Sequence, residues 1–194
     1  MGRVIVIEFV SLDGVMQDPD GTEGFLKPRG GWAFRFGREA VAGDKFKLGE
    51  VMDSGVLLLG RKTWQKFAQL WPTRSDPFST RMNRMQKLVV SGSLEHVDEW
   101  NNSTLLRGDL VDTVCRLKQT RDVVVAGSAS VAHALMRSDV VDEFRLLVFP
   151  CVLGQGERLF DAVLPDLVLT AAEPSGAAAL LTFGCARDVV VSPG

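Results

Sequence analysis

Residues 55 to 64 read GVLLLGRKTW, and this stretch decides the fold class. Its apolar first half predicts a short buried strand that ends at Gly60, and its second half opens a helix. A strand that passes through a glycine into a helix brings backbone N–H groups and the positive end of the helix dipole to one point. Because the Arg61 and Lys62 cations and the Thr63 hydroxyl stand at that point, the turn predicts a phosphate site. The alternative is a surface turn with solvated cations.

The composition is that of an ordinary globular domain, and it excludes several classes of function. Of the 194 residues 46% are hydrophobic and 24% charged, and the formal net charge of −2 gives no general attraction to nucleic acid or an anionic membrane. Three widely spaced cysteines without a CxxC motif indicate reduced thiols in a cytoplasmic protein. Two histidines do not provide a His-rich metal site, and no apolar run reaches the roughly 20 residues of a membrane span. We therefore expect a single domain over residues 1–194 that holds no metal.

Short apolar runs alternate with helical patterns, which predicts an α/β fold with a mixed, mainly parallel sheet. Past residue 150 the pattern changes to strands without long helices, so the C-terminal strands are expected to be antiparallel, with a pair joined through Gly184. The regions 13–31 and 72–80 are expected to be irregular loops. The expected strands are Val4–Val10, Val56–Leu59, Leu88–Val90, Thr104–Leu106, Val123–Ala126, Glu143–Phe149, Leu167–Ala171, Leu180–Phe183 and Arg187–Val191. The expected helices are Glu39–Met52, Lys62–Leu70, Leu110–Lys118 with Asp109 as its N-cap, and Ser128–Met136 with Ser128 as its N-cap.

Glycines and hydroxyls follow three of the expected strands. In an open α/β sheet, ligands bind at the carboxyl ends of the strands, so the three ends together predict a ligand with several phosphates, such as a dinucleotide. The chain lacks the G-x-G-x-x-G pattern of the usual dinucleotide fold. Small residues that only cap helices and form tight turns are the alternative. The candidate cofactor-binding residues are Gly60, Arg61, Lys62, Thr63, Ser91, Gly127, Ser128 and Ala129.

Two carboxylates and one aromatic side chain are candidates for the reacting end of the site. Asp13 ends the first strand in Ser-Leu-Asp-Gly, where it either forms a turn or holds a polar substrate beside the cofactor. Asp44, placed in the helix expected over Glu39–Met52, either stabilises a first turn or supplies a proton. Trp32 either packs in the core or borders the substrate.

Five segments together resemble the reductase domain of the bacterial bifunctional riboflavin-biosynthesis deaminase-reductase, within the dihydrofolate reductase-like superfamily. They occur in the family's order and span nearly the whole chain. The segments are SLDG at 11–14, GRKTW at 60–64, KLVVSGS at 87–93, VVVAGSASVAHAL at 123–135 and VDEFRLLVFPCVLGQGERLF at 141–160.

The resemblance implies a three-layer α/β/α dihydrofolate reductase-like fold, NADPH as the hydride donor, and a homodimer. It implies that the glycine turn at residues 60–63 binds phosphates with Arg61 on the 2′-phosphate, and that Ser91 lies near the adenosine. It also implies that residues 127–129 bind the pyrophosphate and that Asp13 lies at the nicotinamide and substrate edge. Counted back from Gly60 without a gap, Asp44 falls where dihydrofolate reductases carry their proton-donating carboxylate.

The chain departs from the family in three respects. Ala126-Gly127-Ser128 stands where the family carries a richer glycine run. No zinc-deaminase motif is present, so the reductase half alone is expected. No clear basic cluster is assigned to a ribose phosphate, and the loop cations Lys27, Arg29, Arg35 and Arg74 are the candidates.

These features predict an NADPH-dependent reductase that transfers a hydride to a small heterocyclic or carbonyl substrate. The activity it most resembles is that of 5-amino-6-(5-phosphoribosylamino)uracil reductase. Two alternatives stay open: dihydrofolate reductase activity, and a regulatory protein that binds NADPH without turnover.

Overall fold

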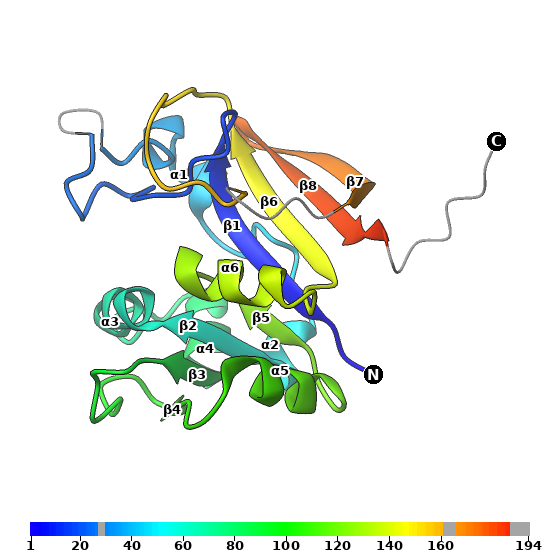
Figure 1. Cartoon of the computed structure of the whole chain (residues 1–194). Coiled ribbons are helices and arrows are strands. Elements are labelled where there is room, and N and C mark those ends of the chain that lie inside the picture. Colours follow the sequence, from blue (N-terminus) through cyan, green and yellow to red (C-terminus); the bar gives the residue numbers. More distant parts are fainter. Residues whose placement is uncertain (27–29, 161–165, 187–194) are drawn as a thin grey trace. The chain divides into compact units, whose positions relative to one another are not determined.

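The computed structural model describes residues 1–26, 30–160 and 166–186. Its strands form an eight-stranded mixed sheet in the order β4-β3-β2-β5-β1-β6-β8-β7 (Figure 1). The contacts group into two compact units, of which unit 1 contains residues 1–6 and 47–141 and unit 2 contains residues 7–46 and the chain from 142 onward. Strand β1 contributes its first residues to unit 1 and the rest to unit 2. That residues 1–194 form a single domain remains a prediction.

Unit 1 contains the parallel part of the sheet. Its strands are β1 (Val4–Ser11, shared with unit 2), β2 (Val56–Gly60), β3 (Gln86–Val90), β4 (Ser103–Leu105) and β5 (Val123–Val125). Every strand pair within it is parallel, and all residues of β2 and β5 are buried. Continuous apolar runs of this kind form strands that are covered on both faces. The strands expected from the sequence here are therefore confirmed.

Helices connect these strands on both faces of the sheet. They are α2 (Val51–Ser54), α3 (Arg61–Leu70), α4 (Pro77–Arg84), α5 (Leu110–Lys118) and α6 (Ala129–Arg137). The connection from β2 to β3 steps in one direction along the sheet, and the connection from β4 to β5 steps in the other. Since such crossovers are right-handed, α3 and α5 cover opposite faces. This arrangement gives unit 1 the expected α/β/α layers.

Helix α4 lies where the sequence was expected to form a loop. Asp76 is its N-cap, with a side chain that accepts a hydrogen bond from the backbone N–H of Ser79 at 3.1 Å, and Pro77 follows at the first helical position. An acidic cap followed by proline is a regular helix start. Helix α5 begins in the same way and as expected, because Asp109 accepts from the N–H of Asp112 at 2.9 Å.

The single helix expected over Glu39–Met52 is wrong. Only α1 (Arg38–Val41) and α2 are helical there. Three residues between them have positive φ angles, namely Gly43 at 78°, Lys47 at 51° and Gly49 at 52°. A right-handed helix cannot continue through such residues. The apolar spacing that suggested a helix therefore belongs to an irregular segment.

Unit 2 contains the rest of β1, the 3-10 helix η1 (Phe34–Phe36), α1, and the strands β6 (Glu143–Phe149), β7 (Leu167–Ser175) and β8 (Ala178–Cys185). The expected antiparallel pairing is confirmed for β6 with β8 and for β7 with β8. The joint expected at Gly184 is wrong, because Gly184 pairs with Val168 inside the ladder and the hairpin turns at Gly176, whose φ is +62°. The strand expected at 187–191 lies outside the described residues.

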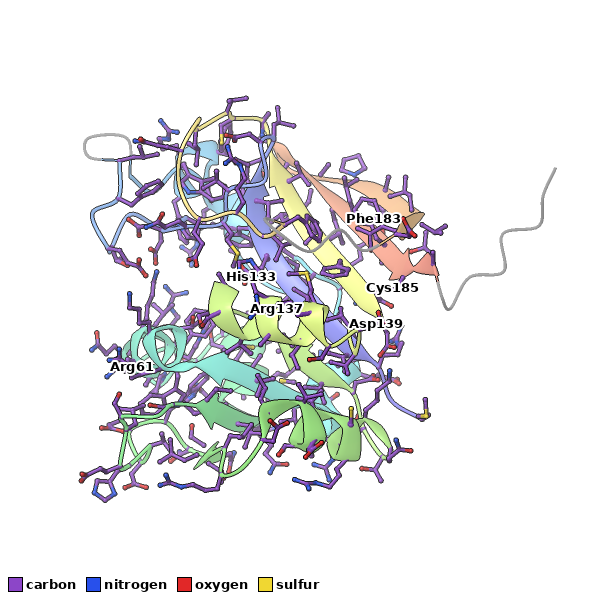
Figure 2. All side chains as sticks on the ribbon, viewed as in Figure 1. Arg61, His133, Arg137, Asp139, Phe183 and Cys185 are labelled. Atoms are coloured by element: carbon purple, nitrogen blue, oxygen red, sulfur yellow. The ribbon has the colours of Figure 1, made fainter. Side chains whose placement is uncertain are left out.

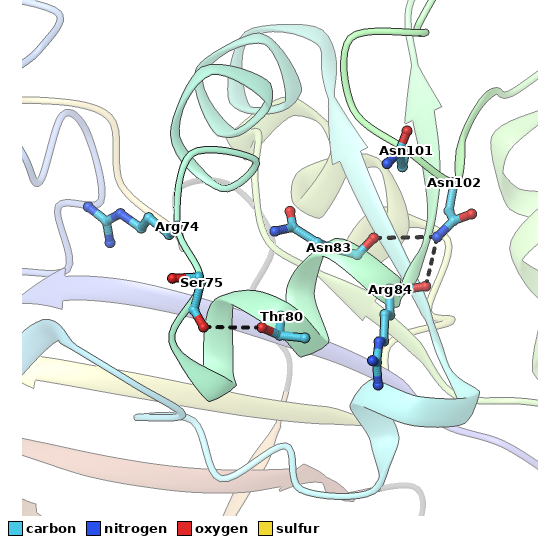
Figure 3. Close-up of a pocket in the computed structure, with 7 residues that line it drawn as sticks. All are labelled: Arg74, Ser75, Thr80, Asn83, Arg84, Asn101 and Asn102. Atoms are coloured by element: carbon cyan, nitrogen blue, oxygen red, sulfur yellow. Dashed lines mark hydrogen bonds between the residues drawn. The ribbon is translucent and has the colours of Figure 1, made fainter.

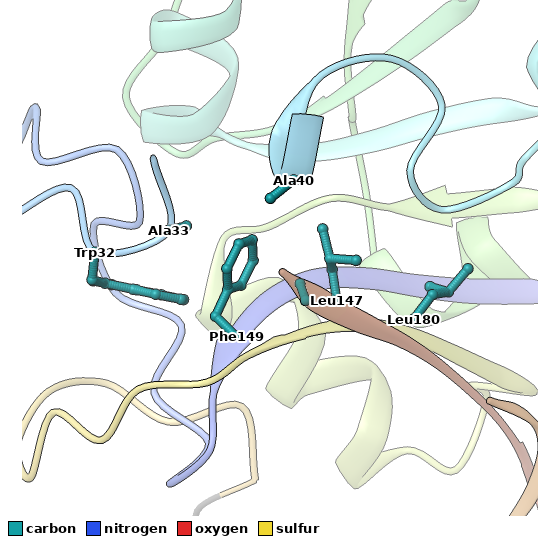
Figure 4. Close-up of a cluster of buried hydrophobic side chains, with 7 residues drawn as sticks. Trp32, Ala33, Ala40, Leu147, Phe149 and Leu180 are labelled. Carbon is teal, nitrogen blue, oxygen red and sulfur yellow. The ribbon is translucent and has the colours of Figure 1, made fainter. Parts of the chain in front are cut away.

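The core of unit 2 forms around Phe149 (Figure 4). Trp32 meets the Phe149 ring edge-on at 5.7 Å between centroids, and Leu147 and Leu180 pack in the same cluster. Across the part of the chain that the structure describes, no helix is long and apolar enough to cross a membrane.

Candidate functional site

Three candidate phosphate-binding positions lie at one edge of the sheet in unit 1. Gly60 ends β2, Ser91 follows β3, and Gly127 comes two residues after β5. Since β2 lies between β3 and β5 and all three are parallel, their carboxyl ends are adjacent. The convergence expected from the sequence is present. We call this edge the strand-end cradle, consisting of Gly60–Thr63, Ser91 and Gly127–Ala129.

The centre of the strand-end cradle is a close approach of two chain segments. The N–H of Gly60 donates to the carbonyl oxygen of Gly127 at 3.0 Å. A Cβ atom on Gly60 would lie 2.3 Å from Ser128 Oγ and 3.0 Å from Ser128 N. The Gly127–Ser128 peptide bond is cis. This contact requires a glycine at position 60 although the backbone there, with φ −75°, is open to any residue.

Two helices begin at this contact, and neither has a side-chain cap. Gly60 is the N-cap of α3 and Ser128 that of α6, and no side-chain oxygen accepts from their first-turn N–H groups. The Ser128 hydroxyl instead bonds the Ser130 hydroxyl at 2.8 Å. Helices α4 and α5 of the same unit are both capped by aspartates. The strand-end cradle thus combines two helix starts without a side-chain cap, an arrangement that suits an anion.

Cations and hydroxyls surround these donors. Arg61 and Lys62 are exposed at the start of α3 (Figure 2), and within the described residues neither side chain has a hydrogen-bond or ion-pair partner. The Ser91 hydroxyl oxygen accepts from the N–H groups of Ser93 at 3.1 Å and Leu94 at 2.9 Å. Its own O–H remains a donor. The cradle therefore offers two exposed cations, helix N–H groups and hydroxyls, which is the chemistry of a polyphosphate site.

Asp13 in unit 2 links the end of β1 to a distant loop. Its carboxylate accepts from the Ser11 hydroxyl at 2.6 Å and from the N–H groups of Leu153 at 3.1 Å and Gly154 at 2.8 Å. Arg158 lies 3.8 Å away and donates to the Asp13 carbonyl. The Ser11 hydrogen bond, followed by those from the loop N–H groups, lowers the pKa of Asp13 to about 2. At neutral pH Asp13 is an ionised acceptor, which favours positioning over proton donation; its catalytic and substrate-binding roles remain predictions.

We expect Asp13→Asn to destabilise the protein by about 2 kcal/mol at pH 7, because an amide cannot accept from all of these donors. Because the pKa of Asp13 is lowered by folding, its contribution is present above about pH 4 and is lost as the pH falls toward 2. Urea unfolding at pH 7 and pH 3 measures the loss of stability and its dependence on pH. The difference in the free energy of unfolding between wild type and variant should be smaller at pH 3 than at pH 7. The exposed Asp98→Asn is the control. The same difference in the free energy of unfolding at both pH values would contradict the role of the ionised carboxylate.

Trp32 and Asp44 are placed differently from Asp13. The Trp32 side chain is fully buried in the unit 2 core, and its indole N–H donates to the Gln17 carbonyl at 2.8 Å. This geometry supports the packing alternative, so its assignment to substrate binding stays a prediction without structural support. Asp44 lies half-buried in the bend after α1, not in a helix. Its proton-donating role likewise stays a prediction.

Glu8 is a site candidate that the sequence reasoning missed. It lies in β1, and its Oε1 atom is buried without a hydrogen-bond partner among the described residues. Burial, with Glu157 as a second cause, raises the pKa of Glu8 from 4.5 to about 8. The carboxyl group is therefore protonated at neutral pH. A single acid inside the apolar run VIVIEFV was the available signal.

Of the four loop cations considered for a ribose phosphate, two belong to the described residues, one in each unit. Lys27 and Arg29 lie outside the described residues. Arg35 is exposed in unit 2, and Arg74 in unit 1 lies over the Trp71 ring at 5.4 Å.

The strand order and the cradle define the class of protein, namely the dihydrofolate reductase-like α/β fold. The chain belongs to the RibD C-terminal domain family, whose model matches residues 3–178. The resemblance stated from the sequence is thereby confirmed.

Two curated relatives come from Bacillus subtilis (strain 168). Uncharacterized protein YyaP is 30% identical over 111 residues, and this match covers 54% of the present chain and 58% of YyaP. Uncharacterized protein YwjB is 29% identical over 160 residues, which cover 81% of the chain and 82% of YwjB.

Solved structures agree on the fold. A Shewanella sp. PV-4 protein whose name places it in riboflavin biosynthesis is 21% identical with a TM-score of 0.70, and the match covers 95% of this chain and 99% of that one. Acinetobacter baumannii RibD is 17% identical with a TM-score of 0.63. The match covers 95% of this chain but only 58% of RibD.

Proposed function

We propose that the protein is an NADPH-dependent reductase that transfers a hydride to a C=N or C=O carbon of a small heterocyclic or carbonyl substrate. Membership of the RibD C-terminal domain family supports the reductase class and a nicotinamide cofactor. The observation that carries the proposal is the pair of uncapped helix starts meeting at Gly60 and Ser128. Together with the Arg61 and Lys62 cations beside them, these helix starts suit a ligand with several phosphates.

The residues of the strand-end cradle fit the phosphates of such a cofactor. The first-turn N–H groups of α6 and the Ser128 hydroxyl would hold the pyrophosphate. Arg61 and Lys62 would hold the 2′-phosphate, and the Ser91 hydroxyl would donate to the adenosine part. The bound nicotinamide supplies the hydride, and the protein supplies binding, orientation and exclusion of water.

Reduction of a C=N or C=O bond also consumes one proton. We propose Asp44, the carboxyl group expected from the sequence, as its donor at neutral pH. Asp13, ionised at that pH, would instead accept a hydrogen bond from the substrate or position the loop that it holds.

The substrate that best matches the family is 5-amino-6-(5-phosphoribosylamino)uracil. NADPH oxidation, followed by absorbance, should occur with this pyrimidine and not with dihydrofolate. NADPH oxidation with dihydrofolate and not with the pyrimidine would identify the protein as a dihydrofolate reductase. Selective NADPH binding without NADPH oxidation in the presence of any pyrimidine or pterin would favour the regulatory alternative.

We expect the wild-type protein to bind NADPH at least about tenfold more tightly than NADH, and Arg61→Gln to reduce that preference. A charge-assisted contact to the 2′-phosphate contributes roughly 1.5–3 kcal/mol, which corresponds to this ratio. Titration of both cofactors by tryptophan quenching or calorimetry measures it. Arg116→Gln, which removes the same charge from an exposed position in α5, should leave the ratio of NADPH to NADH affinity unchanged. Equal wild-type affinities for NADPH and NADH would remove the 2′-phosphate role of Arg61.

A homodimer in the cytoplasm is the assembly and location that we propose. The family resemblance supports the dimer, and the three free cysteines support a reducing compartment. Light scattering of the purified chain measures the mass of the assembly.

A further inference from the structure

A second polar pocket lies in unit 1, away from the strand-end cradle (Figure 3). It is an open depression of about 500 Å³. Asn83 and Arg84 come just before β3, and Asn101 and Asn102 just before β4. Since the strands are parallel, the pocket lies at the amino edge of the sheet, whereas the strand-end cradle lies at the carboxyl edge. The lining residues are Arg74, Ser75, Thr80, Asn83, Arg84, Asn101 and Asn102.

The walls of the pocket are held by hydrogen bonds. Thr80, Asn83 and Arg84 lie on one face of α4, at the spacing that brings helix side chains together. The Asn83 side chain donates to the Trp71 carbonyl at 2.9 Å and accepts from the Trp100 indole N–H at 2.7 Å. The Asn102 amide donates to the carbonyl of Arg84 at 3.0 Å. These bonds fix α4 against the turn that precedes β4.

The charge of this pocket is positive. Arg74 and Arg84 are exposed at its rim, and no carboxylate occurs among its lining residues. Within the described structure the Arg84 guanidinium has no hydrogen-bond or ion-pair partner. Figure 3 shows the two guanidinium groups on different sides of the pocket, with that of Arg74 turned away from the other lining residues. The rim therefore offers these two groups on exposed side chains, together with the Ser75 hydroxyl.

A buried cation lies directly behind the wall. Lys87 is fully buried, and its ammonium group donates to the carbonyls of two wall residues, Asn83 at 2.7 Å and Asn101 at 2.8 Å. It also lies 4.3 Å from the centre of the Trp100 ring. No described carboxylate pairs with it, and burial lowers the pKa of Lys87 to about 8. A buried charge without a counter-ion is costly, and an anion in the pocket would offset that cost.

We propose that this pocket binds a small phosphate-bearing anion, with Arg84 as a direct contact, Arg74 as a second contact once its exposed side chain turns from the Trp71 ring, and Lys87 as a fixed positive charge behind the wall. Guanidinium groups match phosphate oxygens in charge and in hydrogen-bond geometry. The Ser75 hydroxyl supplies a neutral donor, whereas the Thr80 hydroxyl donates to the Ser75 carbonyl at 3.5 Å. The site is separate from the strand-end cradle and does not depend on the proposed reductase activity.

The test uses inorganic phosphate as the probe and removes the competing cradle. In an Arg61→Gln/Lys62→Gln background, calorimetry should show saturable binding of one phosphate per chain, measured against chloride at equal ionic strength. Arg74→Gln and Arg84→Gln added singly should each weaken binding about tenfold. Both arginines are exposed, so the variants should fold, and circular dichroism checks this.

Arg116→Gln in the same background is the matched control and should bind phosphate like its parent. The absence of saturable binding in the Arg61→Gln/Lys62→Gln background would overturn the proposal. Equal weakening by Arg116→Gln would also overturn it, because the effect would then come from net charge.

Discussion

Glu8→Gln is expected to stabilise the protein by on the order of 3 kcal/mol at pH 7 and to remove a large part of its pH dependence. Folding raises the pKa of Glu8 from 4.5 to about 8, so the folded state binds this proton more tightly than the unfolded state. Wild-type stability therefore falls as the pH rises from about 4.5 to 8. Glutamine resembles the neutral acid and cannot ionise. Urea unfolding at pH 4.5, 7 and 9 measures how the free energy of unfolding changes with pH in wild type and in the variant.

The exposed Glu99→Gln is the matched control for charge. Its free energy of unfolding should change with pH as that of wild type does. An equal change of the free energy of unfolding with pH in wild type and Glu8→Gln would show that folding does not raise the pKa of Glu8.

Gly60→Ala is expected to cost 1–3 kcal/mol in stability and more than about tenfold in NADPH affinity. The new Cβ would lie 2.3 Å from Ser128 Oγ and 3.0 Å from Ser128 N, so the starts of α3 and α6 must move apart. Urea unfolding and cofactor titration measure the two losses.

Gly92→Ala is the matched control at the same sheet edge, because no atom lies within 4 Å of the position of its Cβ. We expect its effect to stay within about 0.5 kcal/mol. Ser128→Gly combined with Gly60→Ala removes the Oγ and Cβ atoms that cause the closest contacts and should recover part of the stability. An unstable double variant would mean that the backbone contact alone forbids a side chain at position 60.

Strands and helices that are specified by residues within their own segment were predictable from the sequence. The apolar runs of β2 and β5 indicated strands buried on both faces, and α5 has its bounds as expected because Asp109 caps it from within the segment. Glycines and hydroxyls after three parallel strands likewise indicated the strand-end cradle, since strand direction alone brings those ends to one edge. Helix α4 was missed although its Asp-Pro start is also local.

Features that depend on distant parts of the chain were decided by the tertiary structure. The pKa of Asp13 is lowered first by the nearby Ser11 hydroxyl and then by the N–H groups of the distant Leu153 and Gly154. The ionisation of Glu8 depends on its burial and on Glu157. The burial of Trp32 against Phe149 also depends on the tertiary structure, and its role in substrate binding stays a prediction. Hydrophobic patterning and capping act over a few residues, so the sequence by itself determined the fold class, most elements and the edge that would hold phosphates. Desolvation and long-range hydrogen bonds act between segments that meet only after folding, so the protonation states of the carboxyl groups and the positive pocket at the amino edge came from the tertiary structure alone.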